Sequence, residues 1–412
     1  MNYSDVPTYF FLFVGLYFQI FLLVTFFEKE EEKYPELPKG LAYPRVAITV
    51  PCFNEEKTLT KTVLSLRALD YPKEKLEILI IDDGSTDNTY AVAQELVRTY
   101  PEVKFIHQKN GGKHTAVNLG ITSTTADFVA CLDADSEVAP NALKIMLPLF
   151  ADPKVAAVTP AIRVQNPENL IQTVQRTEYN IGIFTKRIFG RLNAIHVTPG
   201  PFSVFRREIF STIGLFKKAH NTEDMEIALR IQSYGYTIEN CHKAYVYTVT
   251  PPTIKRLHTQ RVRWIAGFMK NAIDYRHLFF NKKIGHMATF TLPFATLSIL
   301  GSLYFIISFL IRFGERIYNS IEKMSVVGFD FNILPRHIFD WFFLDTATSS
   351  FIGMLIITIT IAIICIGKYF AEGTMKPSRD MLYFLVVYGV IAPFWFSKAL
   401  YNTALSRKTP WR

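Results

Sequence analysis

The feature that most constrains the fold of this chain is a set of apolar runs long enough to cross a bilayer. A membrane-spanning helix needs about 20 consecutive, mainly apolar residues. The first run covers residues 9–27, and three more lie near the C-terminus, at about 287–311, 347–367 and 381–405. A long region of mixed composition separates the first run from the others. The sequence therefore predicts one span before this region and about three spans after it.

Composition supports a division into membrane-embedded and water-exposed parts. The mean hydropathy of the 412 residues is +0.15, which is high for a water-soluble protein, yet the 20% of charged residues excludes a chain that is membrane span throughout. Lys and Arg outnumber Asp and Glu by 45 to 36. In a membrane protein this excess indicates basic cytoplasmic loops rather than nucleic-acid binding. The cysteines are too widely spaced to indicate a zinc site or a disulfide framework; they are Cys52, Cys131, Cys241 and Cys365.

Basic residues near the span ends predict the orientation of the chain. Residues 1–8 contain no Lys or Arg, whereas residues 255–283 contain eight basic residues and the single acid Asp274. Because Lys and Arg are enriched on the cytoplasmic side, the large middle region is predicted to be cytoplasmic. Residues 314–345 would then lie outside and residues 368–380 inside.

The C-terminus conflicts with a simple four-span arrangement. A fourth span would place the C-terminus outside, where basic residues are not favoured. The alternative is that one C-terminal segment is re-entrant or interfacial, and the sequence leaves this open. The residues that create the conflict are Lys398, Arg407, Lys408 and Arg412.

The middle region alternates short apolar strands with helical segments. Short buried strands alternating with helices are typical of an α/β fold with a mostly parallel sheet covered on both faces. The predicted strands are 46–52, 76–82, 103–107, 127–132 and 155–159, and the predicted helices lie near 55–69, 87–99, 114–123 and 140–150.

Three acidic clusters follow the predicted strands, at the edge where sheets of this kind bind ligands. Glu55 follows the first strand, Asp82 and Asp83 the second, and Asp133 and Asp135 the fourth. Two carboxylates two residues apart after a strand can hold a hard divalent cation against phosphate oxygens. Three such clusters converging on one edge indicate a nucleotide site.

A glycine pair and a lysine, in the segment Asn110-Gly111-Gly112-Lys113, add backbone N–H groups and a cation that can meet phosphate. Taken alone, each of these clusters is also compatible with an ordinary turn or helix cap. The chain has neither P-loop spacing nor a GxGxxG motif, which argues against ATPases and dinucleotide enzymes.

Two later motifs carry further polar groups. Thr222-Glu223-Asp224 precedes an apolar helical pattern and could be a helix start with acids in its first turn. Residues 260–264 read QRVRW and could belong to a basic amphipathic helix on the membrane surface. Such a helix can still present arginines to phosphate, so the structural and functional interpretations are compatible.

In chain order the sequence contains PCFNEE, DDGSTD, GGK, LDAD, a TPGP loop, TED and QRVRW, followed by spans. This order resembles the membrane-integrated processive glycosyltransferases of family 2, which include synthases of poly-N-acetylglucosamine, hyaluronan, chitin oligosaccharide and cellulose. The resemblance covers about residues 45–270. It implies a nucleotide-sugar-binding domain of the glycosyltransferase A type, plus transmembrane and interfacial helices. It also implies an inverting single displacement and export of the polymer through the spans.

The resemblance implies four regions. We expect residues 1–40 to be an N-terminal transmembrane helix and linker, and residues 41–254 a cytoplasmic glycosyltransferase domain. Residues 255–285 would form interfacial amphipathic helices, and residues 286–412 the C-terminal membrane region. The enzyme would sit in the cell membrane.

The resemblance also assigns roles to individual residues. Asp224 would be the general base that deprotonates the acceptor hydroxyl, supported by Glu223. Asp135, with Asp133, would hold Mg²⁺ or Mn²⁺. Acceptor binding would fall to Trp264, Gly200 and Pro201. The implied donor-binding residues are Glu55, Asp82, Asp83, Lys113, Asp133, Gln260, Arg261 and Arg263.

The compact layout of the chain most resembles poly-N-acetylglucosamine synthase. The expected donor is therefore UDP-N-acetylglucosamine, and the expected acceptor is a growing polysaccharide at the lipid bilayer, with an accessory subunit as a further partner. One alternative is a non-processive enzyme that glycosylates a lipid, as ceramide glucosyltransferase does. Another is a membrane transporter or scaffold with an inactive domain.

Overall fold

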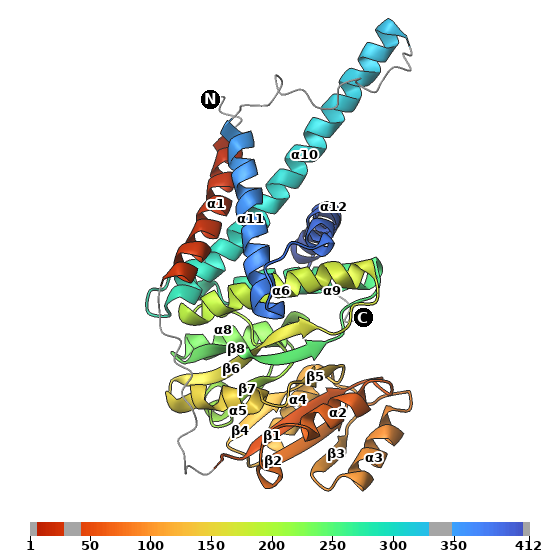
Figure 1. The fold of residues 1–412 in the computed structure, drawn as a ribbon, viewed down its shortest axis with the longest axis vertical. Helices are drawn as coiled ribbons and strands as arrows, with labels where there is room; N and C mark the ends of the chain where they lie inside the picture. The colour runs from red at the N-terminus through yellow and green to blue at the C-terminus, as the bar shows by residue number, and fades with distance from the viewer. Residues whose placement is uncertain (1–5, 29–42, 329–347, 407–412) are drawn as a thin grey trace.

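A computed structural model describes residues 6–28, 43–328 and 348–406 of the chain. An α/β domain lies at one end, a layer of helices covers it, and long apolar helices extend from that layer (Figure 1). The strands are β1 (Val46–Cys52), β2 (Leu76–Asp82), β3 (Val103–His107), β4 (Phe128–Cys131), β5 (Ser136–Val138), β6 (Val155–Val164), β7 (Ser203–Arg206) and β8 (Thr237–Thr248).

The helices of the α/β domain are short, and those that cover it or extend from it are long. They are α1 (Val6–Phe27), α2 (Leu59–Arg67), α3 (Thr89–Thr99), α4 (Lys113–Thr122), α5 (Ala142–Met146), α6 (Leu170–Arg191), α7 (Ile209–Ile213), α8 (Glu223–Ser233), α9 (Ile254–Asp274), α10 (Leu292–Val327), α11 (Thr348–Glu372) and α12 (Arg379–Ala404).

The strands form one sheet in the order β3-β2-β1-β4-β7-β6-β8-β5. The first four strands of this order are parallel, as predicted, and their bounds agree closely with the predicted ones. The sheet as a whole is mixed, because β7 runs antiparallel to both β4 and β6, and β5 runs antiparallel to β8. The parallel half brings the ends of β1, β2 and β4 to one edge, which is what the predicted nucleotide site requires.

Both faces of the parallel half are covered, which explains why its strands are almost continuously apolar. Along β1, Val46 and Ile48 pack in one core cluster with Val63 of α2. Ala47, between them, points to the other face and packs with Ala116 of α4. Each strand therefore places consecutive residues in two different cores.

Four helices in the described part of the chain are long and apolar enough to cross a membrane, namely α1, α10 with the π-helical turn before it, α11 and α12. Their positions agree with the predicted spans. The exception is that α10 continues to Val327, so residues 314–327 are helical and not part of a loop. The remainder of the predicted outer loop, at 329–345, falls outside the described residues.

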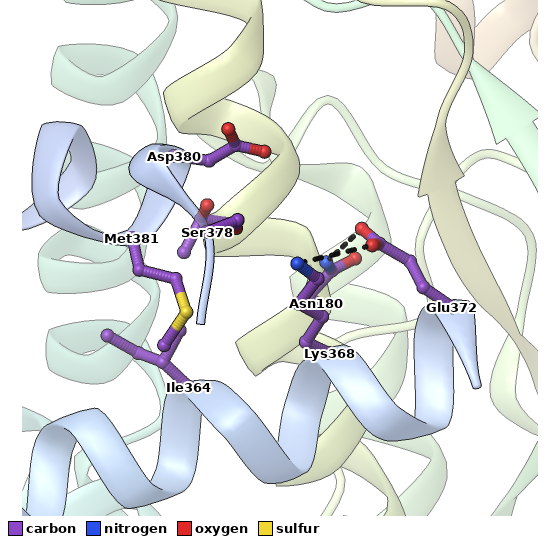
Figure 2. A pocket seen from close by; sticks show the side chains of 8 residues that line it. Asn180, Ile364, Lys368, Glu372, Ser378, Asp380 and Met381 are labelled. Atoms are coloured by element: carbon purple, nitrogen blue, oxygen red, sulfur yellow. Dashed lines mark hydrogen bonds and ion pairs between the residues drawn. The ribbon is translucent and has the colours of Figure 1, made fainter. Parts of the chain in front are cut away.

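Close backbone approach seats α11 against α6. A Cβ placed at Gly367 of α11 would lie 2.6 Å from the backbone oxygen of Asn180 and 2.9 Å from its carbonyl carbon. One turn further along, Glu372 accepts a hydrogen bond from the Asn180 amide at 2.9 Å, and Lys368 also points toward it (Figure 2). Only glycine allows this approach.

We therefore predict that Gly367→Ala destabilises the protein by about 1–3 kcal/mol, because the added methyl group meets backbone atoms that cannot rotate away. The measurement is the midpoint of thermal unfolding in detergent. Gly353→Ala is the matched control in the same helix, since a Cβ there meets nothing within 4 Å. Equal midpoints for the two variants would contradict the packing described here.

Candidate functional site

Asp82 and Asp83, at the end of β2, organise the loops at the edge of the sheet. The buried Asp82 carboxylate accepts hydrogen bonds from the Ser85 hydroxyl at 2.5 Å and pairs with His107 Nδ1 at 2.7 Å. The Asp83 carboxylate accepts hydrogen bonds from the backbone N–H groups of Gly111 and Gly112, both at 2.9 Å. Asp83 therefore fixes the glycine turn that begins α4, where Gly112 has a φ of +94°. Their predicted contacts with the donor stay predictions.

The loop after β1 is tied to the loop after β2. Asn54 adopts a left-handed φ of 58° and donates its backbone N–H to Ser85 Oγ at 2.9 Å. Its side-chain oxygen accepts a hydrogen bond from the backbone N–H of Thr86 at 2.8 Å. Glu55 follows directly, and its carboxylate accepts a hydrogen bond from Thr58 Oγ1 at 2.8 Å. Glu55 is thereby held at the predicted edge.

Lys113, at the start of α4, forms an ion pair with Asp133, which follows β4. Gly200 of the TPGP loop lies directly over this pair, because a Cβ there would be 2.6 Å from Lys113 Nζ and 2.8 Å from either Asp133 carboxylate oxygen. Pro201 follows and is half-buried. The structure thus brings a predicted acceptor loop onto two predicted donor residues.

Asp135, which follows β4, lies in surroundings that disfavour its charged form. Burial raises its pKa to about 7, and repulsion from Asp133 and Glu55 adds to the effect. Its hydrogen-bond partner is the Ser136 hydroxyl, at 3.2 Å. A bound cation would relieve this repulsion, so the chemistry of the donor set fits a divalent metal. Within the described residues no group of three or more His, Cys, Asp or Glu side chains has metal-binding geometry. The remaining ligands would be phosphate oxygens and water, as is usual for Mg²⁺.

Glu223 and Asp224 begin α8 and lie beside the same lysine. Burial raises the pKa of both carboxyls, and the nearby Lys113 and Arg263 oppose the rise. Burial alone would lower the pKa of Lys113, but Asp133, Glu223 and Asp224 together raise it above its ordinary value. The backbone oxygen of Asp224 accepts hydrogen bonds from Thr198 N at 3.0 Å and Thr198 Oγ1 at 2.9 Å. The TPGP loop and the TED motif are therefore fastened to each other.

Helix α9, in the layer between the α/β domain and the long apolar helices, positions the TED motif (Figure 1). Gly267 faces Thr222 so closely that a Cβ would overlap the threonine side chain. Asn271 donates a hydrogen bond to Thr222 Oγ1 at 2.9 Å, and Arg263 Nη1 donates one to the backbone oxygen of Asn221 at 2.8 Å. The three residues before Thr222 all have left-handed backbone conformations, at φ values of 40°, 58° and 64°. Strain of this kind persists only where surrounding contacts enforce it.

The two arginines of the QRVRW motif have different surroundings. Arg263 faces Asp224 and Glu223. The buried Arg261 guanidinium instead pairs with Glu178 of α6 at 2.5 Å and donates a hydrogen bond to Gln260 Oε1 at 2.8 Å. It also lies 4.1 Å from the ring centroid of Trp264. We expected both arginines to turn toward the donor, and in this structure the contacts of Arg261 lead to α6 instead. Its direct contact with the donor stays a prediction.

Sequence reasoning missed two residues of this network, Glu178 and Tyr388. The Tyr388 hydroxyl, in α12, donates a hydrogen bond to Glu178 Oε2 at 2.5 Å. Neither residue lies in a local motif. The only signals were an acid within an amphipathic segment and a tyrosine within an apolar run. Neither signal identifies a partner of Arg261. Glu178 and Arg261 are about 80 residues apart in the chain, and Glu178 and Tyr388 are more than 200 residues apart.

Sequence comparison links the chain to known proteins. The family model described as "Glycosyl transferase family 2" matches residues 47–214. The chain is 28% identical to a poly-beta-1,6-N-acetyl-D-glucosamine synthase of Staphylococcus epidermidis over 365 residues, which are 87% of this chain and 84% of the relative. It is 33% identical to the synthase of the same name from Staphylococcus aureus strain COL over 225 residues, 54% of each chain.

Structure comparison extends the similarity of fold to the membrane helices. The mannosyltransferase PcManGT from Pyrobaculum calidifontis, solved in complex with GDP-Man and Mn²⁺, aligns with a TM-score of 0.64. The alignment covers 98% of both chains at 17% sequence identity. The likeness at this identity concerns the fold, and it includes the helices that extend from the α/β domain.

The position of Gly200 yields a prediction for the site. Gly200→Ala should reduce turnover of the nucleotide sugar on the order of 10²-fold, because the methyl group forces Lys113 and Asp133 apart or displaces the loop, and misplacement of about 1 Å can cost this much. The measurement is the rate of nucleotide release by purified protein. Gly182→Ala in α6 is the control, since a Cβ there meets nothing within 4 Å. Turnover at the wild-type rate in Gly200→Ala would contradict the assignment of this loop.

Proposed function

We propose that this glycosyltransferase, whose residues 47–214 match the model of glycosyl transferase family 2, transfers N-acetylglucosamine from UDP-N-acetylglucosamine to a growing polysaccharide. The transfer would invert the anomeric centre in a single displacement. The membrane helices would export the polymer, and the catalytic domain would face the cytoplasm.

The observation that carries this proposal is the convergence of charged groups from four separate motifs. Lys113 is electrostatically coupled to Asp133, Glu223 and Asp224, and Arg263 is coupled to the same three carboxylates. These residues are separated by up to 150 positions in the chain. Partly buried opposite charges in such number are costly to assemble and are concentrated at functional sites.

The arrangement suits displacement at a sugar carbon. The departing diphosphate gains negative charge, which the Lys113 ammonium and the Arg263 guanidinium can stabilise within a partly buried site. The acceptor hydroxyl is a weak nucleophile, so it needs a carboxylate within hydrogen-bond reach. Asp224 is the proposed base, because burial favours its proton-bound form and therefore makes it a stronger proton acceptor than an exposed aspartate. Glu223 would share the resulting charge.

Asp133 and Asp135 would hold Mg²⁺ or Mn²⁺ beside the donor. A divalent ion at this position supplies positive charge to the diphosphate oxygens. The two carboxylates follow β4 and flank the buried Ala134, which fixes their spacing along the rim. The ion pair with Lys113 would orient the Asp133 carboxylate.

The relatives support the choice of sugar and of a polymeric product. Two of them carry the name poly-beta-1,6-N-acetyl-D-glucosamine synthase, and one of these aligns with most of the chain. The eight basic residues within 255–283 support a cytoplasmic orientation of the domain. Trp264, half-buried beside Arg261, is the proposed stacking surface for the acceptor sugar. An accessory subunit remains a further proposed partner.

The product decides between the proposed function and its alternatives. We predict that purified protein in lipid nanodiscs, given radiolabelled UDP-N-acetylglucosamine and Mg²⁺, yields a polymer that a glycosidase specific for β-1,6-linked N-acetylglucosamine digests. Parallel incubations with other UDP-sugars and with GDP-mannose test the donor. A single sugar attached to extracted lipid would identify a lipid glycosyltransferase instead, and failure to turn over any donor would indicate an inactive scaffold.

The base assignment predicts a selective loss. Asp224→Asn keeps the size of the side chain but removes the proton acceptor, so transfer should fall about 10²- to 10⁴-fold while donor affinity stays near wild type. In the wild-type enzyme, kcat/KM should fall as the pH decreases through the raised pKa of Asp224, above the usual aspartate range. Asp70→Asn, at an exposed surface ion pair, is the control. Near-normal transfer by Asp224→Asn would eliminate it as the base.

Metal dependence predicts that a chelator abolishes turnover and that added Mg²⁺ or Mn²⁺ restores it. Asp135→Asn should bind Mn²⁺ more weakly, as measured by electron paramagnetic resonance in the presence of UDP, because one of two proposed carboxylate ligands loses its charge. Glu137→Gln, on the neighbouring strand β5, is the control. Full activity of the wild-type enzyme in excess chelator would rule out the metal.

A further inference from the structure

We propose that α12 does not cross the membrane but lies along its surface, on the same side as the catalytic domain. In this arrangement its inner face packs on the layer formed by α6 and α9 over the catalytic domain, which we call the catalytic layer. Its outer face is immersed in the boundary between lipid headgroups and acyl chains. Three spans, α1, α10 and α11, would then cross the bilayer. Both ends of α12 would be on the catalytic side, which removes the conflict posed by the basic residues near the C-terminus.

The direction of α12 differs from that of its neighbours. In Figure 1, α1 and α11 run along the long axis of the molecule, whereas α12 is seen nearly end-on, above α6 and α9. It packs chiefly against α9 and α6, and less extensively against α10. Neither α6 nor α9 is apolar enough to be a span candidate in the described part of the chain. A helix that lies on these two helices therefore follows the surface of the catalytic layer.

Contacts to this layer occur at the beginning, the middle and the end of α12. Asp380, in its first turn, forms an ion pair with Arg176 of α6. Tyr388, near the middle, donates its hydrogen bond to Glu178. Thr403, in the last turn, contacts the sulfur of Met269 in α9 at 3.9 Å. A helix of 26 residues is about 39 Å long. If α12 crossed the bilayer, one end would lie at the catalytic layer, and its middle and its other end would be too far away to contact that layer.

The hydrogen bond from Tyr388 to Glu178 indicates how deep the middle of α12 lies relative to the membrane. Glu178 is also the partner of Arg261, which belongs to the motif beside the catalytic residues. If α12 spanned the membrane, this ion pair would lie near the centre of the bilayer, where charged side chains are costly. The middle of α12 therefore lies at the level of the catalytic layer.

The outer face of α12 identifies lipid as the surface that it meets. Leu382, Val386, Val390 and Phe394 recur every four residues and are 63%, 58%, 63% and 65% exposed. On the opposite face, Trp395 and Ala399 are buried against Val262 and Ala266 of α9. A stripe this apolar is unfavourable in water, and its position beside three spans places acyl chains within reach.

The connection between α11 and α12 turns the chain back before it leaves the catalytic side. Gly373 follows α11 with a left-handed φ of 75°, and only six residues, 373–378, separate α11 from α12. Arg176 lies between the two helices, 3.8 Å from Glu372 of α11 and paired with Asp380 of α12. Figure 2 shows Glu372, Ser378 and Asp380 gathered around this junction with α6.

The first test compares the sides of three introduced cysteines. Ser406→Cys reports the end of α12, Ser211→Cys the catalytic domain and Ser325→Cys the far end of α10; all three serines are exposed. Intact cells are treated with a membrane-impermeant maleimide, with wild type as the background for the native cysteines. We expect Ser406→Cys and Ser211→Cys to react alike, only after permeabilisation, and Ser325→Cys to react in intact cells.

The outcomes of this test separate two failures. If the maleimide labels Ser406→Cys under the same conditions as Ser325→Cys, and not under those of Ser211→Cys, α12 crosses the membrane and the inference is wrong. If Ser211→Cys and Ser406→Cys both react in intact cells, the inference holds and the cytoplasmic orientation under the proposed function fails.

The second test measures depth directly. Nitroxide labels at Leu382→Cys, Val390→Cys and Phe394→Cys in liposomes should report equal, shallow immersion by electron paramagnetic resonance. A spanning helix would instead place position 390 about 12 Å deeper than position 382, because eight residues separate them at 1.5 Å each. A depth difference of that size would overturn the inference even if the cysteine reactions were ambiguous.

Discussion

The site depends on how the protein compensates a cluster of partly buried negative charge. Asp133, Asp135, Glu223 and Asp224 are brought together from two distant segments, and their mutual repulsion would separate those segments without cations between them. Lys113 supplies one cation from the catalytic domain. Arg263 supplies another from α9, which belongs to the layer of helices that covers this domain. The α/β domain and the helices that cover it therefore share one electrostatic centre.

Much of the fold could be predicted because its signals are local. Strands such as β1 and β2 are continuous apolar runs that end in polar clusters, and the structure places them at the predicted residues. The antiparallel entry of β7 was not predictable, since Ser203–Arg206 is too short to carry a pattern and its partners are chosen by tertiary packing. The length of α10 was underestimated because charged residues after Ile311 end the apolar run without ending the helix.

The site was predictable to the extent that it consists of motifs. The acidic residues and Lys113 follow strands or begin helices, and parallel topology brings such positions together. The sequence could not show that Arg261 pairs with Glu178 of α6 while Arg263 faces Asp224 and Glu223. This difference depends on Glu178 and Tyr388, which lie in segments whose patterns indicate only an amphipathic and an apolar helix. When two helices are separated by a long stretch of chain, a contact between them produces no recognisable pattern in the sequence of either helix.

The contact between Gly267 and Thr222 has a mechanical consequence. Thr222 immediately precedes the two carboxylates that begin α8, and α9 approaches it without an intervening side chain. The other face of α9 carries α12. A single helix thus connects the apolar α12 with Thr222, the residue before the two carboxylates of α8, so a shift of α12 against α9 would reach these carboxylates without an intermediate element.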